Sequence, residues 1–338
     1  MTIIFIILII LLFLTSKIYI KKNNEEYMSK KQTTIINSMF LILVFYSHFF
    51  SYINEVNQID NYLKFIIQNV GQLMVTTFLF YSGYGIYESI KKNKQYKNNF
   101  FKKRFLPTFI NFAIAIFLFI IVNILVGNKL NILKVLLSFT GYEAIGNSNW
   151  YMFAIFCEYI FLMISFQLFK NDKNQIHGVL IFSIAYIIII SILKERHWYD
   201  TILCFPAGMY FSYFKCKIEK YILNNKTYGL TLITSLVLFV LLYILHRSVS
   251  SVIIYNVISI LFVFIIILLS IKVKFNNKMF EYLGKRLFWI YILQRIPMII
   301  FKGMFNYQVY FVICIVITLI LAEIMYRISN KLNCVLVR

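Results

Sequence analysis

Few ionisable residues stand inside long apolar stretches of the sequence, and three of them could do chemistry; a fourth, Glu323, lies near the end of the last run and is expected to snorkel or pair with Arg327. His48, Glu158 and Arg295 each have mainly apolar neighbours on both sides. In a membrane interior such residues are costly unless they are paired or hydrated, so each is a candidate functional residue. A neutral imidazole can take a proton from a hydroxyl group near physiological pH, which makes His48 a candidate general base. The alternative is structural: His48 bonds a neighbouring carbonyl group, and Glu158 and Arg295 form an ion pair between two helices.

The composition of the whole chain indicates a membrane protein. Of its 338 residues, 61% are hydrophobic and 14% are charged, whereas soluble proteins average about 45–50% apolar and about 25% charged residues. The formal net charge of +21 would suggest nucleic-acid binding in a soluble protein. Here the basic residues lie in short loops between apolar runs, so we expect contact with membrane lipid and no nucleic acid.

The five cysteines do not suggest a metal or disulfide site. They are scattered along the chain without a CxxC pair, and no histidine lies near them at zinc-ligand spacing. This pattern supports neither a disulfide framework nor a structural zinc site, and we expect no metal.

Eleven apolar runs approach the length of about 20 residues that a helix needs to cross a bilayer. They predict an all-α, polytopic bundle of about 11 transmembrane helices, and nothing in them indicates an oligomeric state. The runs are 2–19, 33–53, 70–87, 106–126, 150–169, 179–193, 198–214, 228–245, 252–271, 287–301 and 309–328.

The distribution of positive charge predicts the orientation of this bundle. Most of the 34 lysines and arginines fall in every second connecting segment, and short basic loops stay in the cytoplasm. We therefore expect a multi-pass protein of the cell membrane with its N-terminus outside and its C-terminus in the cytoplasm. The first run lacks a preceding basic residue and a small-residue cleavage site, so we interpret it as a retained helix.

This topology places the three ionisable residues at similar depths. His48 lies about 23 Å up its helix from the cytoplasmic end, and Glu158 lies about 12 Å below the outer surface. Arg295 falls in the outer half of its helix. The three side chains could therefore meet in one outward-leaning cavity, where Glu158 orients His48 or balances Arg295.

A strongly basic loop, 91–104, has seven positive charges in fourteen residues. One interpretation is that it sets the topology and contacts anionic lipid. The other is that it binds a phosphate-rich donor from the cytoplasm, because arginine offers a bidentate fork to phosphate oxygens.

Several segments resemble, in the same order, those of acyltransferase family 3, which comprises membrane O-acyltransferases including polysaccharide O-acetyltransferases. The first core helix of that family has a basic residue, ten further residues and then histidine. Here His48 has this spacing and Asn37 replaces the basic residue, while Gln294 and Arg295 stand where the family often has histidine. The other similar segments are 77–84 (TFLFYSGY), 101–107 (FKKRFLP), 149–151 (NWY), 204–208 (CFPAG) and 283–293 (LGKRLFWIYIL).

The resemblance covers about residues 33–338, which we predict to be an acyltransferase-like transmembrane domain. Residues 1–32 would then be an additional N-terminal helix and basic loop.

The resemblance implies an O-acyltransferase that uses acetyl-CoA, or a related acyl-CoA, from the cytoplasm. The acceptor would be a hydroxyl group of an extracytoplasmic glycan or another hydroxyl-bearing molecule. His48 would deprotonate this hydroxyl or carry the acyl group, and Glu158 would orient the imidazole. The remaining site residues would bind the donor and the acceptor or polarise the acyl carbonyl; they are Asn37, Lys103, Arg104, Trp150, Tyr291 and Arg295.

A membrane transporter or flippase of a glycan or lipid-linked precursor is the alternative. Such proteins often show an internal repeat with paired Gly- or Pro-broken helices in the two halves. We find no such repeat, although Pro206 and Pro297 interrupt two of the predicted helices.

Overall fold

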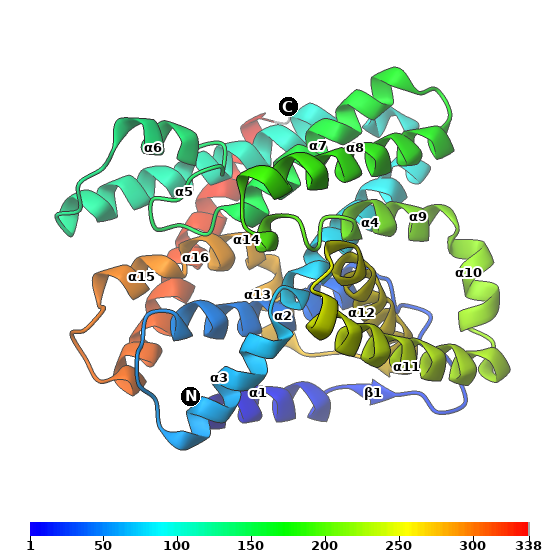
Figure 1. Cartoon of the computed structure of the whole chain (residues 1–338), viewed down its shortest axis with the longest axis horizontal. Helices are drawn as coiled ribbons and strands as arrows, with labels where there is room; N and C mark the ends of the chain where they lie inside the picture. The colour runs from blue at the N-terminus through cyan, green and yellow to red at the C-terminus, as the bar shows by residue number, and fades with distance from the viewer. Residues whose placement is uncertain (337–338) are drawn as a thin grey trace.

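The computed structural model describes residues 1–336 and is built almost entirely of helices (Figure 1). The predicted all-α, polytopic fold is confirmed. Val337 and Arg338, the last residues of the predicted acyltransferase-like domain, lie outside the described part of the chain. The longer helices are α2 (Lys30–Phe50), α3 (Gln58–Val70), α4 (Leu73–Lys92), α5 (Leu106–Leu125), α7 (Trp150–Leu168), α8 (Asp172–Leu193), α11 (Asn225–Val249), α12 (Val252–Lys272) and α16 (Tyr307–Leu336).

Short elements join these helices. Two-residue strands, β1 (Lys17–Ile18) and β2 (Val273–Lys274), pair antiparallel. The short helices and helical turns are α1 (Thr2–Leu14), η1 (Lys94–Tyr96), η2 (Phe101–Phe105), α6 (Ile132–Ser138), η3 (Arg196–Trp198), α9 (Cys204–Tyr213), α10 (Lys215–Ile222), α13 (Lys278–Lys285), α14 (Leu287–Leu293) and α15 (Arg295–Ile300).

Seven helices within residues 1–336 are long and apolar enough to cross a membrane, which makes this a multi-pass membrane protein. They are α2, η2 continued by α5, α7, α8, α11, α12 and α16. Helices α3 and α4 supply an eighth span if they are counted together, because they meet at a bend of 45°. Gly71, with a φ of +50°, forms this bend, a conformation that glycine adopts without steric cost.

The other three predicted spans are helical but shorter than a bilayer requires. Helix α1 has 13 residues and α9 has 10, so α9 is only about 15 Å long. The predicted run 287–301 is divided into α14 and α15 at Gln294. Pro297 explains this break, because it has no N–H for the Leu293 carbonyl group and its ring clashes with that carbonyl.

Helices α4 and α9 cross in unusually close contact at two glycines. A Cβ atom on Gly208 would lie 2.0 Å from the Phe80 carbonyl oxygen, and one on Gly83 would lie 2.1 Å from the Phe205 carbonyl oxygen. Small residues allow membrane helices to approach this closely. Both glycines belong to segments that the sequence singled out, 77–84 and 204–208, and their local purpose is this helix crossing.

We expect the substitution Gly208→Val to destabilise the fold, because the added side chain would collide with the α4 backbone. Overpacking of this kind costs about 1–3 kcal/mol, occasionally more. Thermal unfolding of the purified protein in detergent should show a lower midpoint than wild type. Gly229→Val is the matched control, since no atom lies within 4 Å of a Cβ placed there. An unchanged midpoint for Gly208→Val would contradict the close crossing.

Helix α1 is attached to the rest of the fold through Asp60, which is buried on α3. The amino group of Met1 lies 3.3 Å from the Asp60 carboxylate, and the Thr2 hydroxyl donates to the same oxygen at 2.7 Å. The Tyr307 hydroxyl on α16 donates to the other oxygen at 3.1 Å. The N-terminal helix therefore packs on the bundle at a charged, fully partnered contact.

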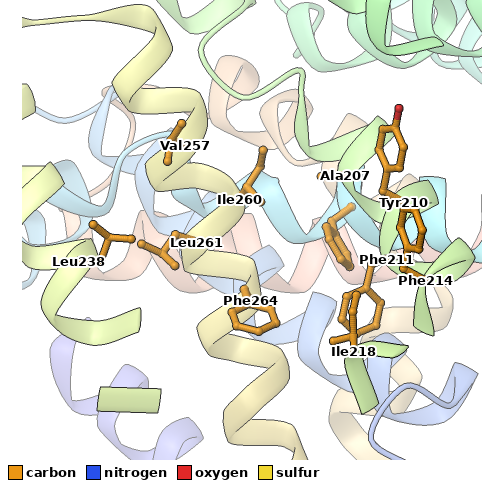
Figure 2. A pocket seen from close by; sticks show the side chains of 11 residues that line it. Ala207, Tyr210, Phe211, Phe214, Ile218, Leu238, Val257, Ile260, Leu261 and Phe264 are labelled. Carbon is orange, nitrogen blue, oxygen red and sulfur yellow. The ribbon is translucent and has the colours of Figure 1, made fainter. Parts of the chain in front are cut away.

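A lateral groove of about 470 Å³ separates α9 and α10 from α11 and α12. Figure 2 shows Val257, Ile260, Leu261 and Phe264 of α12 on one side and the aromatic residues of α9 on the other. The lining is apolar apart from the Tyr210 hydroxyl. Its lining residues are Phe80, Ala207, Tyr210, Phe211, Phe214, Ile218, Leu238, Val257, Ile260, Leu261 and Phe264.

Candidate active site

Helix α2 positions His48 in its last turn. Asn37, Leu41, Val44 and His48 share one face of this helix, because their spacing follows its 3.6-residue period. The His48 side chain is half-buried, and its Nδ1 atom is buried without a hydrogen-bond partner among residues 1–336. The imidazole is therefore available to a ligand or a water molecule.

Tyr291 and Arg295 lie next to this imidazole, on either side of the break between α14 and α15. The rings of His48 and Tyr291 have centroids 6.2 Å apart and are tilted by 52°. Arg295, one turn after Tyr291, is the charged neighbour of both His48 and Tyr52. The structure therefore brings together three of the residues that the sequence analysis proposed for the site.

Aromatic contacts continue from Tyr291 towards the beginning of α7. The Tyr151 ring lies 5.5 Å from the Tyr291 ring, and Trp150 packs edge-on against Tyr151 at 6.1 Å. Trp150 also contacts His197 of η3, with ring centroids 6.0 Å apart. Burial lowers the pKa of His197 below its ordinary value, although the neighbouring Glu195 carboxylate opposes this shift. Trp150 therefore reaches the site through Tyr151, which the sequence analysis assigned no role.

A second cluster of polar side chains, formed by Arg104, Tyr159 and Ser82, lies further along α7. Arg104 Nε donates a hydrogen bond of 2.8 Å to the Tyr159 hydroxyl, and Arg104 Nη2 lies 3.5 Å from Ser82 Oγ. The Ser82 and Tyr159 hydroxyls are 3.3 Å apart. The Arg104 side chain is exposed to solvent although Tyr159 and Ser82 hold it. Lys103 on the same turn is exposed.

The local backbone explains how Arg104 reaches Tyr159 and Ser82. Residues 101–105 form a π-helical turn, η2, ahead of α5. Such turns are rare and often occur at functional sites, since the additional residue rotates the following side chains relative to an α-helix. The sequence shows the basic run but carries no signal for the turn that directs one of its side chains inwards.

Helix α7 joins the two groups into one row of polar side chains. Tyr151 and Tyr159 are eight residues apart, which is about 12 Å along the helix. Tyr151 has Tyr159 and Arg104 as polar neighbours on one side and Tyr291 on the other. We call this row, formed by Arg104, Tyr159, Tyr151, Tyr291 and His48, the polar column.

Residues 35–327 match the profile of acyltransferase family 3, described as an acyltransferase domain. The chain belongs to acyltransferase family 3. No significant match occurs among curated proteins or solved structures. Membership of this family makes the protein a membrane acyltransferase, an enzyme that takes its acyl group from a donor. The division into residues 1–32 and 33–338 stays a prediction.

Glu158 and Asn37, two predicted site residues of the acyltransferase, contact neither the polar column nor Arg295 through a hydrogen bond within residues 1–336. Glu158 is fully buried, and its Oε1 accepts a hydrogen bond of 2.7 Å from Ser183 on α8. Within residues 1–336, no hydrogen bond or ion pair joins Glu158 to His48 or Arg295. Asn37 lies about 16 Å from His48 along α2, with its buried Oδ1 unpartnered in the described chain. The catalytic role of Glu158 and the donor-side role of Asn37 stay predictions.

Unpaired polar atoms gather around His48 in the acyltransferase. Buried polar groups are nearly always hydrogen-bonded, so each exception requires a reason such as catalysis or a bound ligand. Within the described residues, His48 Nδ1, Tyr291 OH, Arg295 Nε and Ser148 Oγ all lack partners. A base can accept a proton from a hydroxyl group, and hydrogen-bond donors beside it can stabilise an oxyanion. These are the two requirements of acyl transfer.

Proposed function

We propose that this acyltransferase moves an acetyl group, or a related acyl group, from cytoplasmic acyl-CoA to a hydroxyl group of an extracytoplasmic glycan. The observation that carries this proposal is the polar column. It joins an accessible arginine, suited to phosphate, with an unpaired imidazole, suited to deprotonating a hydroxyl group.

Arg104 and Lys103 would hold the phosphates of the donor at the cytoplasmic end. The guanidinium group of Arg104 contacts Tyr159 and Ser82 through Nε and Nη2, which leaves Nη1 for a phosphate oxygen. The acyl-bearing arm of CoA would extend past Tyr159 and Tyr151 towards His48. Asn37, on the same face of α2 as His48, would line the donor side.

His48 would act as the base in the transfer step. The imidazole takes the proton of the acceptor hydroxyl, and the oxygen attacks the thioester carbonyl carbon. Tyr291 and Arg295 donate hydrogen bonds to the oxyanion that forms. The C–S bond then breaks, the CoA sulfur takes the proton from His48, and the acylated acceptor leaves past Trp150. In a variant of this mechanism, His48 carries the acyl group as a covalent intermediate.

The orientation in the membrane is part of the proposal. The basic segments 17–31, 91–104, 215–226 and 272–286 would face the cytoplasm under the positive-inside rule. The pairing of β1 with β2 brings two of these segments together. Trp150 and the loop before it lie at the opposite end of α7 from these segments and would face the acceptor outside the cell.

Transfer of labelled acetate in membranes tests the proposed reaction. Membranes from cells that express the protein should transfer radiolabelled acetate from acetyl-CoA to the glycan fraction as an alkali-labile ester, with release of CoA. Membranes without the protein are the control. If the protein changes glycan export without incorporating label, the transporter alternative is favoured and the acyltransferase reaction proposed for this site is wrong.

A further inference from the structure

The loop before α7 is buried, which is unusual for a connection between helices. Loops normally lie at the surface, where water can satisfy their backbone groups. In this loop the exposed fraction is 5% for Ile145, 1% for Asn147 and 3% for Ser148. The protein therefore holds a short non-helical segment against the interior of the bundle, directly before Trp150 and Tyr151.

Specific contacts fix the shape of this loop. Asn123 Nδ2 on α5 donates to the Ile145 carbonyl oxygen at 2.7 Å, and the Ile145 amide donates to Asn147 Oδ1 at 3.0 Å. Gly146 has a φ of +106°, and a Cβ atom there would lie 2.7 Å from Ile299 Cδ1 on α15. Only glycine suits this position, so the loop is locked against the helix that carries Arg295.

The locked loop holds Ser148 three residues before Tyr151, whose ring lies 5.5 Å from the Tyr291 ring. Ser148 Oγ is buried and without a hydrogen-bond partner within residues 1–336, and the same holds for the Tyr291 hydroxyl, which has Ser148 as a polar neighbour. Tyr291 in turn packs beside His48. An unpaired buried hydroxyl is unfavourable, and alanine would remove that cost. The arrangement is understandable if both hydroxyls are used when substrate is bound.

We infer that Ser148 is a positioning residue that directs the Tyr291 hydroxyl towards the carbonyl oxygen of the acyl donor. A tyrosine hydroxyl has one hydrogen to donate and can accept another hydrogen bond. When Ser148 donates to the Tyr291 oxygen, the single Tyr291 hydrogen points to the substrate, and the chain of hydrogen bonds polarises it further. This inference rests on the proposed function, in which Tyr291 stabilises the oxyanion.

A double-mutant cycle tests the inference. Acetate transfer from labelled acetyl-CoA is measured in membranes and normalised to the amount of folded protein, for Ser148→Ala, Tyr291→Phe and the double variant. Loss of an oxyanion donor lowers kcat about 10²–10³-fold, so we expect this for Tyr291→Phe. Ser148→Ala should lower kcat about tenfold, the worth of one good hydrogen bond, with an unchanged KM for acetyl-CoA.

The decisive result is the rate of the double variant. If Ser148 acts through Tyr291, the double variant should be no slower than Tyr291→Phe alone, because residues that act as a unit are not additive. Ser148→Thr keeps the hydroxyl and should retain most of the activity. The inference would be overturned if the losses in kcat of the two single variants multiplied in the double variant. It would also be overturned if Ser148→Ala raised the KM for acetyl-CoA and left kcat unchanged.

Two further variants distinguish a positioning role of Ser148 from an indirect effect on the fold and from a different mechanism. Ser138 is buried in the preceding helix, but its hydroxyl is already bonded to the Val135 carbonyl oxygen at 2.7 Å, so Ser138→Ala should transfer acetate at the wild-type rate. A reduced rate in this control would show that any substitution in the segment before α7 slows the enzyme, and it would contradict a specific positioning role of Ser148. If His48→Ala remains active, the proposed mechanism itself fails, whatever the cycle shows.

Discussion

Replacing His48 with alanine should reduce acetate transfer about 10²–10⁴-fold, the usual contribution of a general base. Without the imidazole, no group beside Tyr291 and Arg295 in the described chain is placed to accept the proton of the acceptor hydroxyl. Folding should change little, because Nδ1 has no protein partner to lose. Acetylation of the acceptor, measured by mass spectrometry, would report the loss.

His177→Ala is the matched control for this experiment. His177 is an exposed histidine of α8 whose ring contacts the Tyr210 hydroxyl, away from the polar column. Its replacement should leave acetylation at the wild-type level. Undiminished acetylation in His48→Ala, with a normal amount of protein in the membrane, would rule out His48 as the base.

Replacing Arg104 with alanine should raise the KM for acetyl-CoA about 10–100-fold, because a hydrogen bond to a charged group contributes about 1.5–3 kcal/mol. The effect on kcat should be smaller, since three tyrosines separate Arg104 from His48 in the polar column. A donor without the CoA phosphates, acetyl-pantetheine, provides the readout. Wild type should strongly prefer acetyl-CoA over this analogue, and Arg104→Ala should lose much of that preference.

Lys103 offers a comparison on the same turn. Its side chain is exposed, so its interaction with a phosphate should be weaker and screened by salt. We expect Lys103→Ala to raise KM only a few-fold at low ionic strength and less at high ionic strength. An unchanged preference for acetyl-CoA in Arg104→Ala would show that Arg104 does not bind the phosphates, and the donor would then enter elsewhere.

Much of the architecture could be predicted from the sequence, because hydrocarbon penalises polar groups strongly. Every apolar run that we identified is helical over most of its length, and the rarity of ionisable residues inside those runs pointed to His48 and Arg295, which are neighbours in the structure. The predicted lengths were less accurate. Pro297 divides one run into α14 and α15, and α9 begins only after the turns that follow Trp198.

The sequence by itself determined which segments form apolar helices, where the basic residues fall between them, and the position of each costly residue along its helix. Only the tertiary structure decided which of these residues meet, because depth along a helix leaves open the rotation of the helix and the identity of its neighbours. Glu158 shows this: its depth resembles that of His48, yet its carboxylate turns to Ser183 on α8. The close crossing at Gly83 and Gly208 fixes α4 against α9, and contacts between other helices place Tyr291 beside both His48 and Tyr151.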